Sequence, residues 1–597
     1  MKRQTIAPLG IILLVAFLLR FIGIQWALPH HFHTDEDVMV YCAERIRTAE
    51  SIQAMTDDLV FFIYSPLPLY WGALSGFVID RFHPIENADP RSRVLLYTAS
   101  RSFSAITGAL TCIVIYLLGA SLGGRGLGLM SALILAFIPI HVRNSHFFTV
   151  DVPFTLFASL ILLSAVSLWK APTLRKAVWG GVAIGFTLLC KYTGAAFFPL
   201  LFSVQLFTIN QLRRQGWSLR RIIAYLAIPP LVGAGVFFLL DPWIFVNFPR
   251  FQETYELLRS LNKGADKPLW TYQFMDQPRG VYWFTNLLPA AITIPVMAAA
   301  VWGMIELIRR KQSEWVPVAL FGMWYFLAVG LSYMRYIRYT IPLAIPFSLC
   351  AAFGLLALKR ALPPGKISRP IVYGIFILVI AFPGLRSMAY LRIFTTEDIR
   401  LTAGNFIQET YPESTCILTD NSAFRPPIGS ELINQPMHTN LSFNEDRYAT
   451  RYDRYTIKLL DVYGYLFDRN VPDDDKRNYI TDRLADVDVI VFSEEAPVQY
   501  SHGFEQHPVM KDFYHRLFSG KSSFRLVSMF QKMPQFGPYR WDDSDVELTW
   551  RLFDHPASWV FERKKTGTDE SGAHTEFDET SNHSWTSHEI AQSRKSS

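Results

Sequence analysis

A short polar stretch, residues 31–37, follows the first hydrophobic segment and contains two histidines and three carboxylates. Charged groups held at a membrane surface are costly and are seldom kept for packing alone. The adjacent carboxylates Asp35 and Glu36 repel each other, which tends to raise the pKa of one and suits a general base working near neutral pH. The spacing His31-x-His33-x-Asp35 is also compatible with a divalent metal, although solvated histidines beside acids are more common. The alternative to a functional site is a solvated, acidic flank of a membrane helix.

Further charged residues stand at the ends of later hydrophobic segments. They are Arg143, His146, Asp151, Lys191, Asp241, Arg335 and Arg338. If they share one side of a membrane, acids and bases from distant parts of the chain form a polar funnel suited to a charged amphiphile. Taken alone, each is more often a charge that snorkels to the interface or caps a helix.

The composition is that of a membrane protein with a soluble portion. Of 597 residues, 50% are hydrophobic, 15% aromatic and only 18% charged. The formal net charge of +6 is small and spread along loops, which argues against nucleic acid as a partner. The five cysteines form no CxxC pair, so neither a zinc site nor a disulfide framework is predicted.

Hydrophobic segments of membrane-spanning length recur up to about Tyr390 and then stop. Counting two short ones, they predict about eleven transmembrane helices. They lie near residues 7–28, 96–119, 127–142, 152–169, 177–190, 194–210, 222–240, 284–307, 315–333, 340–358 and 370–389. The first follows Lys2 and Arg3 and lacks a small-residue cleavage site, so we expect an uncleaved signal anchor.

Basic residues in the loops predict the orientation. Lysine and arginine concentrate in alternate loops, among them 170–176, 213–221, 309–311 and 359–369. The positive-inside bias makes these loops cytoplasmic. The N-terminus is then cytoplasmic, and the odd number of crossings places everything after about Tyr390 outside, together with the charged residues named above.

The first outer loop, residues 29–95, is predicted to lie along the membrane. Residues 37–47 place apolar side chains at helical spacing opposite charged ones, which suits an interfacial helix. Residues 59–71 are too short and too rich in proline to span, and their aromatic side chains belong at headgroup level. The loop is either a connection that follows the membrane or a gate beside a lipid substrate.

Residues 391–563 predict an extracytoplasmic α/β domain. Helices are expected near 399–409 and 476–484, and strands at 416–419, 487–492 and 524–530, the second central and the third nearer an edge. Asp554-His555-Pro556 is most simply a turn before a terminal strand, although Asp554 and His555 could contact an acceptor. Residues 564–597 are poor in apolar side chains, so a disordered tail is expected.

Several short motifs, in this order, resemble the GT-C superfamily of integral-membrane glycosyltransferases over roughly residues 7–390. The resemblance is closest to the branch containing the dolichyl-phosphate-mannose protein mannosyltransferases and the bacterial lipid A aminoarabinose transferase (glycosyltransferase family 39-like). It rests on His33-Thr34-Asp35-Glu36, Ser65-Pro-Leu-Pro-Leu-Tyr-Trp71, Arg101-Ser-Phe-Ser, Thr149-Val-Asp151, Cys190-Lys191-Tyr192 and Arg338-Tyr-Thr-Ile-Pro. Each motif is weak, but the ordered set is fairly specific. It implies a polytopic α-helical membrane domain, GT-C-like, and the residue patterns of 391–563 add to it a C-terminal extracytoplasmic α/β domain.

The resemblance implies a catalytic centre in the first outer loop. Asp35 would be the base, and Glu36 would orient it, position the acceptor or bind a metal. A positioned carboxylate typically contributes about 10²–10⁴-fold to such a step. Asp151 would line the same cavity from the second outer loop.

The resemblance also implies groups that hold a lipid phosphate. Some relatives place a Glu-Lys pair where this chain has Tyr64-Ser65, so here the phosphate must be held by other residues or in another way. Arg338 offers a planar fork that matches phosphate oxygens, and Lys191 adds a point charge. Three residues complete the predicted substrate-binding set: Arg335, Tyr64 and Tyr70.

The predicted function is inverting transfer of a sugar from a polyprenyl-phosphate donor to a hydroxyl of a protein, lipid or glycan. The expected location is the plasma (inner) membrane of a prokaryote. No P-loop or Rossmann glycine motif is present, so no nucleotide-sugar site is predicted, and a divalent metal is the only cofactor considered. The main alternative is a transporter or flippase for a glycolipid or charged amphiphile, which usually carries its charges near the bilayer midplane in repeated halves. A family member that has lost activity and only binds a partner is a third possibility.

Overall fold

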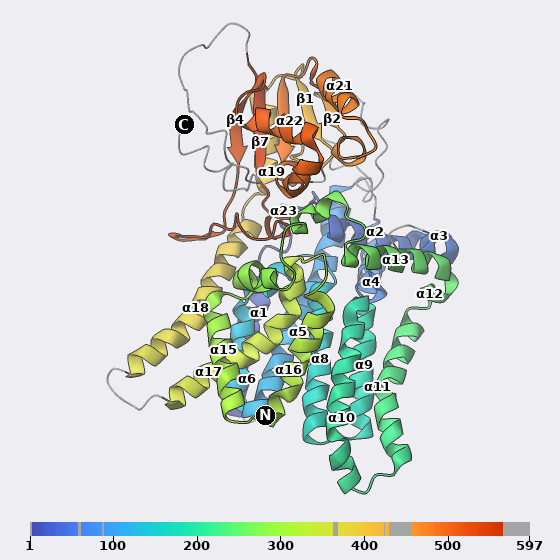
Figure 1. Ribbon diagram of the computed structural model, residues 1–597, viewed down its shortest axis with the longest axis vertical. Coiled ribbons are helices and arrows are strands. Elements are labelled where there is room, and N and C mark those ends of the chain that lie inside the picture. The colour runs from blue at the N-terminus through green and yellow to red at the C-terminus, as the bar shows by residue number, and fades with distance from the viewer. Residues whose placement is uncertain are drawn as a thin grey trace. The chain divides into compact units, whose positions relative to one another are not determined.

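The computed structural model describes residues 3–57, 61–85, 89–361, 368–422, 424–428 and 455–564. The expected disordered tail, apart from Lys564, lies outside these residues. The chain forms two units, each described by itself below (Figure 1). Unit 1 comprises 1–265, 278–395 and 534–541; unit 2 comprises 266–277, 396–533 and 542–597. Each unit is therefore built from three separate stretches of the sequence.

Unit 1 consists of helices and one small two-stranded sheet, β5 (Gln535–Phe536) with β6 (Tyr539–Arg540). Among its described residues, six helices are long and apolar enough to cross a membrane, or up to seven if a bent pair counts as one. Three more are apolar but shorter, so the count of about eleven stays a prediction. The helices are α1 (Arg3–Phe21), α2 (Thr34–Thr48), α3 (Ile52–Thr56), α4 (Pro66–Phe82), α5 (Pro90–Gly123), α6 (Arg125–Phe137), α7 (Pro139–Asn144), α8 (Asp151–Lys170), α9 (Leu174–Cys190), α10 (Phe198–Arg214), α11 (Leu219–Leu240), α12 (Trp243–Val246), α13 (Phe248–Lys263), α14 (Leu288–Ala291), α15 (Ile294–Arg309), α16 (Val316–Val329), α17 (Ala344–Ala361) and α18 (Ser368–Phe394).

Two predicted spans are interrupted. The segment 127–142 breaks into α6 and α7 at Ile138, since Pro139 cannot donate a backbone hydrogen bond and begins the next helix. The segment 284–307 bends by 111° between Trp283–Ala291 and Ile294–Arg309. Thr293, at the bend, has a φ of 83°, a conformation rare for a β-branched residue.

Glycines allow two pairs of helices to approach closely. A Cβ on Gly303 of α15 would lie 2.0 Å from the carbonyl oxygen of Cys350 in α17. A Cβ on Gly128 of α6 would lie 2.5 Å from the carbonyl oxygen of Tyr116 in α5. Small residues at such contacts let backbones pack without the side chains between them.

The first outer loop folds into three helices, as far as it is described. The helix predicted over residues 37–47 is present as α2, whose first turn contains Asp35, Glu36 and Asp37, and its place at the membrane interface stays a prediction. His33 caps it by accepting a hydrogen bond from the Glu36 backbone N–H. Acidic side chains stabilise the N-terminal end of a helix, so the acidic motif both begins α2 and sets the direction of its carboxylates.

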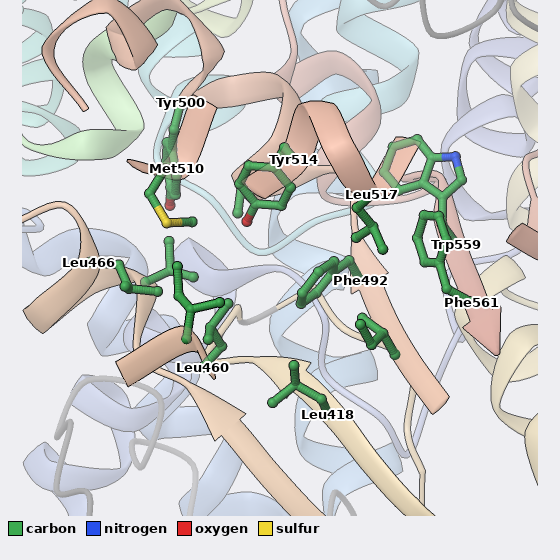
Figure 2. Close-up of a cluster of buried hydrophobic side chains, with 14 of the residues drawn as sticks. Leu418, Leu460, Leu466, Phe492, Tyr500, Met510, Tyr514, Leu517, Trp559 and Phe561 are labelled. Carbon is green, nitrogen blue, oxygen red and sulfur yellow. The ribbon is translucent and has the colours of Figure 1, made fainter. Parts of the chain in front are cut away.

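Unit 2 contains a five-stranded sheet with the order β2-β1-β3-β7-β4. β1 (Cys416–Asp420) pairs in parallel with β2 (Thr456–Leu460) and β3 (Val489–Ser493). β7 (Ser558–Arg563) runs antiparallel to β3 and to the edge strand β4 (Phe524–Phe530). The helices include α19 (Ile399–Thr410), α21 (Asp473–Leu484), α22 (Pro508–Phe518) and α23 (Thr549–Leu552). Figure 2 shows side chains of the sheet, among them Leu418 and Phe492, packed in one core with Tyr514 and Leu517 of α22.

The helices and strands predicted in residues 391–563 are present. β3 is fully buried and central in the sheet, and β4 is at an edge, as predicted. Asp554-His555-Pro556 forms the predicted approach to β7, and Asp554 and His555 are 1% exposed. His555 bonds Asp554 through Nδ1 and Asp543 through Nε2, so these side chains hold the turn.

Candidate active site

Asp35 joins two distant parts of unit 1. Its Oδ1 accepts a hydrogen bond from the Tyr64 hydroxyl at 2.9 Å, and its Oδ2 pairs with the Arg338 guanidinium. Arg338 belongs to η5 (Ile337–Leu343) and is 303 residues away in the chain. The side chains of Asp35 and Arg338 are 23% and 20% exposed. Both charged groups are therefore partly accessible to solvent.

The predicted rise in the pKa of one acidic neighbour is wrong for Asp35. Burial alone would raise the pKa of its carboxyl, but the Arg338 charge, His33 and the Tyr64 hydrogen bond outweigh burial and lower it. Asp35 is therefore ionised at neutral pH.

A second ion pair lies beside the first. Lys191 Nζ bonds Asp151 Oδ1 at 2.8 Å and sits 4.4 Å from the Tyr339 ring centroid. Arg338 interacts electrostatically with both Asp35 and Asp151. Two carboxylates and two cations, from α2, α8, η5 and the residue after α9, thus form one cluster. Its formal charge is zero, because the two carboxylates balance the two cations.

Glu36 does not share this exposure. It is 0% exposed, and Arg101 of α5 donates to both of its oxygens at 2.8 Å. The Phe148 backbone N–H also donates to Oε1 at 2.8 Å. Arg101 donates further to the carbonyls of Ile24 and Trp26. Glu36 therefore connects α2 to α5 and to the segment after α7.

The two histidines of the first outer loop do not converge with Asp35 on one point. His31 pairs with Asp37, which also accepts from Tyr97 at 2.7 Å, while His33 caps α2. Burial lowers the pKa of His33 to about 4, so it is neutral at pH 7. No group of three or more His, Cys, Asp or Glu in the described ranges could hold a metal ion. These residues do not fit the metal site that their spacing allowed.

Several predicted residues lie in other surroundings. Arg335 is buried with its guanidinium 6.0 Å from the Tyr282 ring centroid. Arg143 donates to the Tyr390 hydroxyl at 3.0 Å, and His146 contacts the backbone carbonyls of Val142 and Ile22. Tyr70 donates to the Leu240 carbonyl at 2.6 Å. The cluster therefore includes Asp35, Tyr64, Asp151, Lys191 and Arg338 from the predicted set.

Sequence reasoning assigned no role to Arg101. A signal was present, because an arginine inside an apolar segment of membrane length needs a partner. The partner itself could not be read from the sequence, since Glu36 lies 65 residues away and has two acidic neighbours.

Residues 97–238 match the model of the family described as dolichyl-phosphate-mannose-protein mannosyltransferase. The membrane unit resembles a GT-C glycosyltransferase. This resemblance, predicted from the motifs, is confirmed. The match covers less than half of the chain, and the apolar helices support an integral-membrane location.

Solved GT-C structures show a distant likeness. The archaeal oligosaccharyltransferase AglB of Archaeoglobus fulgidus is 12% identical with a TM-score of 0.47, covering 85% of this chain and 71% of its own. ArnT of Cupriavidus metallidurans, bound to undecaprenyl phosphate, is 12% identical with a TM-score of 0.47, covering 94% and 98%. The protein O-mannosyltransferase Pmt1-Pmt2 complex of S. cerevisiae, bound to the sugar donor, is 19% identical with a TM-score of 0.33, covering 42% and 34%. No curated protein matches the sequence. This likeness is too distant to assign residues.

Proposed function

We propose that this chain is an inverting glycosyltransferase that moves a sugar from a polyprenyl-phosphate carrier to a hydroxyl acceptor. The observation that carries the proposal is the cluster in which an ionised, partly exposed carboxylate, Asp35, adjoins the cations Arg338 and Lys191. A single displacement at an anomeric carbon needs this combination, a proton acceptor beside groups that hold a leaving phosphate.

The steps follow from the charges. Asp35 takes the proton of the acceptor hydroxyl while the hydroxyl oxygen attacks the anomeric carbon. The bond between that carbon and the phosphate oxygen breaks, and its electron pair leaves with the phosphate. Arg338 and Lys191 stabilise the charge that develops there. Attack opposite the leaving group inverts the anomeric centre.

Asp35 and the donor phosphate compete for Arg338. A bound phosphodiester draws the guanidinium toward itself, which weakens its hold on the Asp35 carboxylate. Asp35 then becomes a stronger base, because an adjacent cation is what lowers its pKa. Tyr64 keeps the carboxylate oriented through Oδ1. Glu36 acts in this proposal as a positioning residue, since it holds the first turn of α2 against Arg101.

The site is proposed to face the extracytoplasmic side of the plasma membrane of a prokaryote, with unit 2 on the same side and the N-terminus in the cytoplasm. The concentration of lysine and arginine in alternate loops supports this orientation. The acceptor is a hydroxyl of a protein, a lipid or a glycan, and the sugar is a hexose or pentose. A lipid-linked sugar donor reaches the site through the bilayer, so the site needs no motif for binding a nucleotide sugar.

The decisive experiment measures transfer of labelled sugar from a panel of polyprenyl-phosphate donors in membranes that contain the full chain. Asp35→Asn should lower the rate by about 10²-fold or more while donor binding is retained. Asp80→Asn is the matched control, because Asp80 is 43% exposed and pairs with Arg47 on another part of the loop. Unchanged transfer by Asp35→Asn would exclude Asp35 as the base.

The broken helix between Trp283 and Arg309 is the one observation that favours a transporter or flippase. Wild-type protein that moves a glycolipid across vesicles but transfers no sugar from any donor would replace the glycosyltransferase proposal with this one.

A further inference from the structure

A second polar cluster surrounds Asp241, the residue that follows α11. Asp241 is only 2% exposed, and its Oδ2 is buried without a hydrogen-bond partner among the residues described. Burial raises the pKa of this carboxyl to about 7. A buried carboxyl with an unused oxygen is costly, and it indicates a group that a ligand completes.

The neighbours of Asp241 are hydroxyls and aromatic rings. Asp241 interacts electrostatically with Tyr70 and Tyr192, and the Tyr192 hydroxyl contacts that of Ser65. Tyr70 donates to the Leu240 carbonyl and accepts a hydrogen bond from Trp243 Nε1 at 2.7 Å. Tyr70, Tyr192 and Trp243 are each partly exposed as residues. No cation in the described part of the chain shifts the pKa of Asp241.

Two pairs of consecutive residues connect this cluster to the candidate active site. In Tyr64-Ser65, Tyr64 donates to Asp35 and Ser65 contacts Tyr192. In Lys191-Tyr192, Lys191 pairs with Asp151 and Tyr192 contacts Ser65 and faces Asp241. The Asp241 cluster therefore adjoins the cations that would hold a phosphate.

We propose that Asp241, Ser65, Tyr70 and Tyr192 form a subsite for the hydroxyl groups of the donor's sugar ring. This subsite rests on the proposed transferase function. Carboxyl and hydroxyl groups can both donate to and accept from sugar hydroxyls, and partly exposed aromatic residues can cover the apolar face of a sugar ring. A phosphate does not fit beside Asp241 itself, because no cation among the described residues acts on that carboxyl, and the neighbouring Arg338 and Lys191 already provide for a phosphate. A site built to pair with a hydroxyl rejects a ligand that lacks it, so Asp241 would help determine which sugar is used.

The test compares binding of two ligands to the full chain in nanodiscs. One is polyprenyl phosphate without a sugar, and the other is the sugar-bearing polyprenyl phosphate that wild type binds best in a donor panel. Asp241→Asn and Tyr192→Phe should bind the sugar-free carrier as wild type does and lose roughly 10-fold or more in affinity for the sugar-bearing carrier. Asp80→Asn and Tyr255→Phe are the controls, since Asp80 is 43% exposed and Tyr255 is 51% exposed.

Three results would overturn the subsite. Equal loss for both carriers would place Asp241 in phosphate binding or in the fold, and unchanged affinity for both would leave it without a sugar contact. Unchanged donor affinity with a raised KM for a sugar acceptor would show that the hydroxyls belong to the acceptor. Failure of wild type to bind either carrier would instead refute the transferase proposal itself, which separates the two ideas.

Discussion

At the scale of single residues, the chemistry depends on which cation each carboxylate meets. Asp35 and Glu36 are adjacent in sequence, yet one contacts Arg338 at a partly exposed site and the other contacts Arg101 in full burial. The two carboxylates therefore have different partners and different burial although they are neighbours in the sequence. For Asp35, the Arg338 guanidinium is the largest of the influences that lower the pKa of the carboxyl.

Arg338 should control the pH range in which Asp35 is ionised. Its guanidinium lowers the pKa of Asp35, so Arg338→Gln should raise that pKa. Because the base must be deprotonated in the free enzyme, the acidic limb of the kcat/KM profile should move to higher pH. Rates measured from pH 4 to 9 should show this shift in addition to an overall loss, whereas Arg338→Lys should keep the position of the limb. An Arg338→Gln profile that is lower but not displaced would contradict the pairing.

At the scale of helices and strands, a buried ion pair between Glu36 and Arg101 holds α2 in position. Glu36 in its first turn contacts Arg101 and the Phe148 backbone, which fixes the direction of the neighbouring Asp35. Removing one partner of such a pair leaves an uncompensated buried charge.

Glu36→Gln should destabilise the protein by about 3–5 kcal/mol and lower transfer activity, since α2 loses its contact with α5. Thermal unfolding of the purified full chain measures the first effect, and the transfer assay measures the second. Glu253→Gln is a control at a 66% exposed ion pair and should change stability by less than about 0.5 kcal/mol. The double variant with Glu36→Met and Arg101→Met should be more stable than Glu36→Gln, because no buried charge is left alone. A single variant as stable as the control would exclude this positioning role.

The turn before β7 should make unit 2 sensitive to alkaline pH. Burial disfavours the charged form of His555, but Asp543 and Asp554 outweigh burial and raise its pKa to about 9. The folded pKa is above the unfolded value of about 6.5, so the stabilisation of about 3 kcal/mol is complete below pH 6.5 and is lost as pH rises through 9.

Unfolding of unit 2, followed by hydrogen exchange at pH 6, 7.5 and 9, should show this decline. His555→Gln lacks the titrating group, so its stability should be lower at pH 6 and should change less between pH 6 and 9. An equal decline in both proteins would rule out His555 as the cause.

At the scale of the whole molecule, the proposed orientation concerns the two sides of the membrane. It places the loop between α15 and α16 on the cytoplasmic side and helix α22 on the extracytoplasmic side. The five native cysteines are buried, so single introduced cysteines can report each side. With a membrane-impermeant maleimide on intact cells, Lys511→Cys in α22 should be labelled. Ser313→Cys, in an exposed position between α15 and α16, should be labelled only after permeabilisation. Labelling of both positions, or the reverse order, would refute the predicted crossings.

The sequence by itself determined features that depend on neighbouring residues. Hydrophobic length identified most helices of unit 1, helical spacing and the acidic cap identified α2, and buried apolar runs identified β1 and β3. The ordered motifs also indicated the GT-C resemblance that the family match confirms. Where a span was predicted whole but is bent, as at Thr293, hydrophobic length alone could not reveal the bend, although Pro295 marks the start of the next helix.

Only the tertiary structure decided which charges meet. Asp35 pairs with Arg338 across 303 residues, while Arg335, three positions earlier, faces Tyr282 instead. Likewise the neighbours of Asp241 come from distant parts of the chain, since Tyr70 belongs to α4 and Tyr192 follows α9. Pairing and burial depend on how helices pack, and they determine the pKa of a carboxyl. Residue type and spacing therefore indicated where chemistry could occur. Helix packing determined the partner and the burial of each charged side chain there.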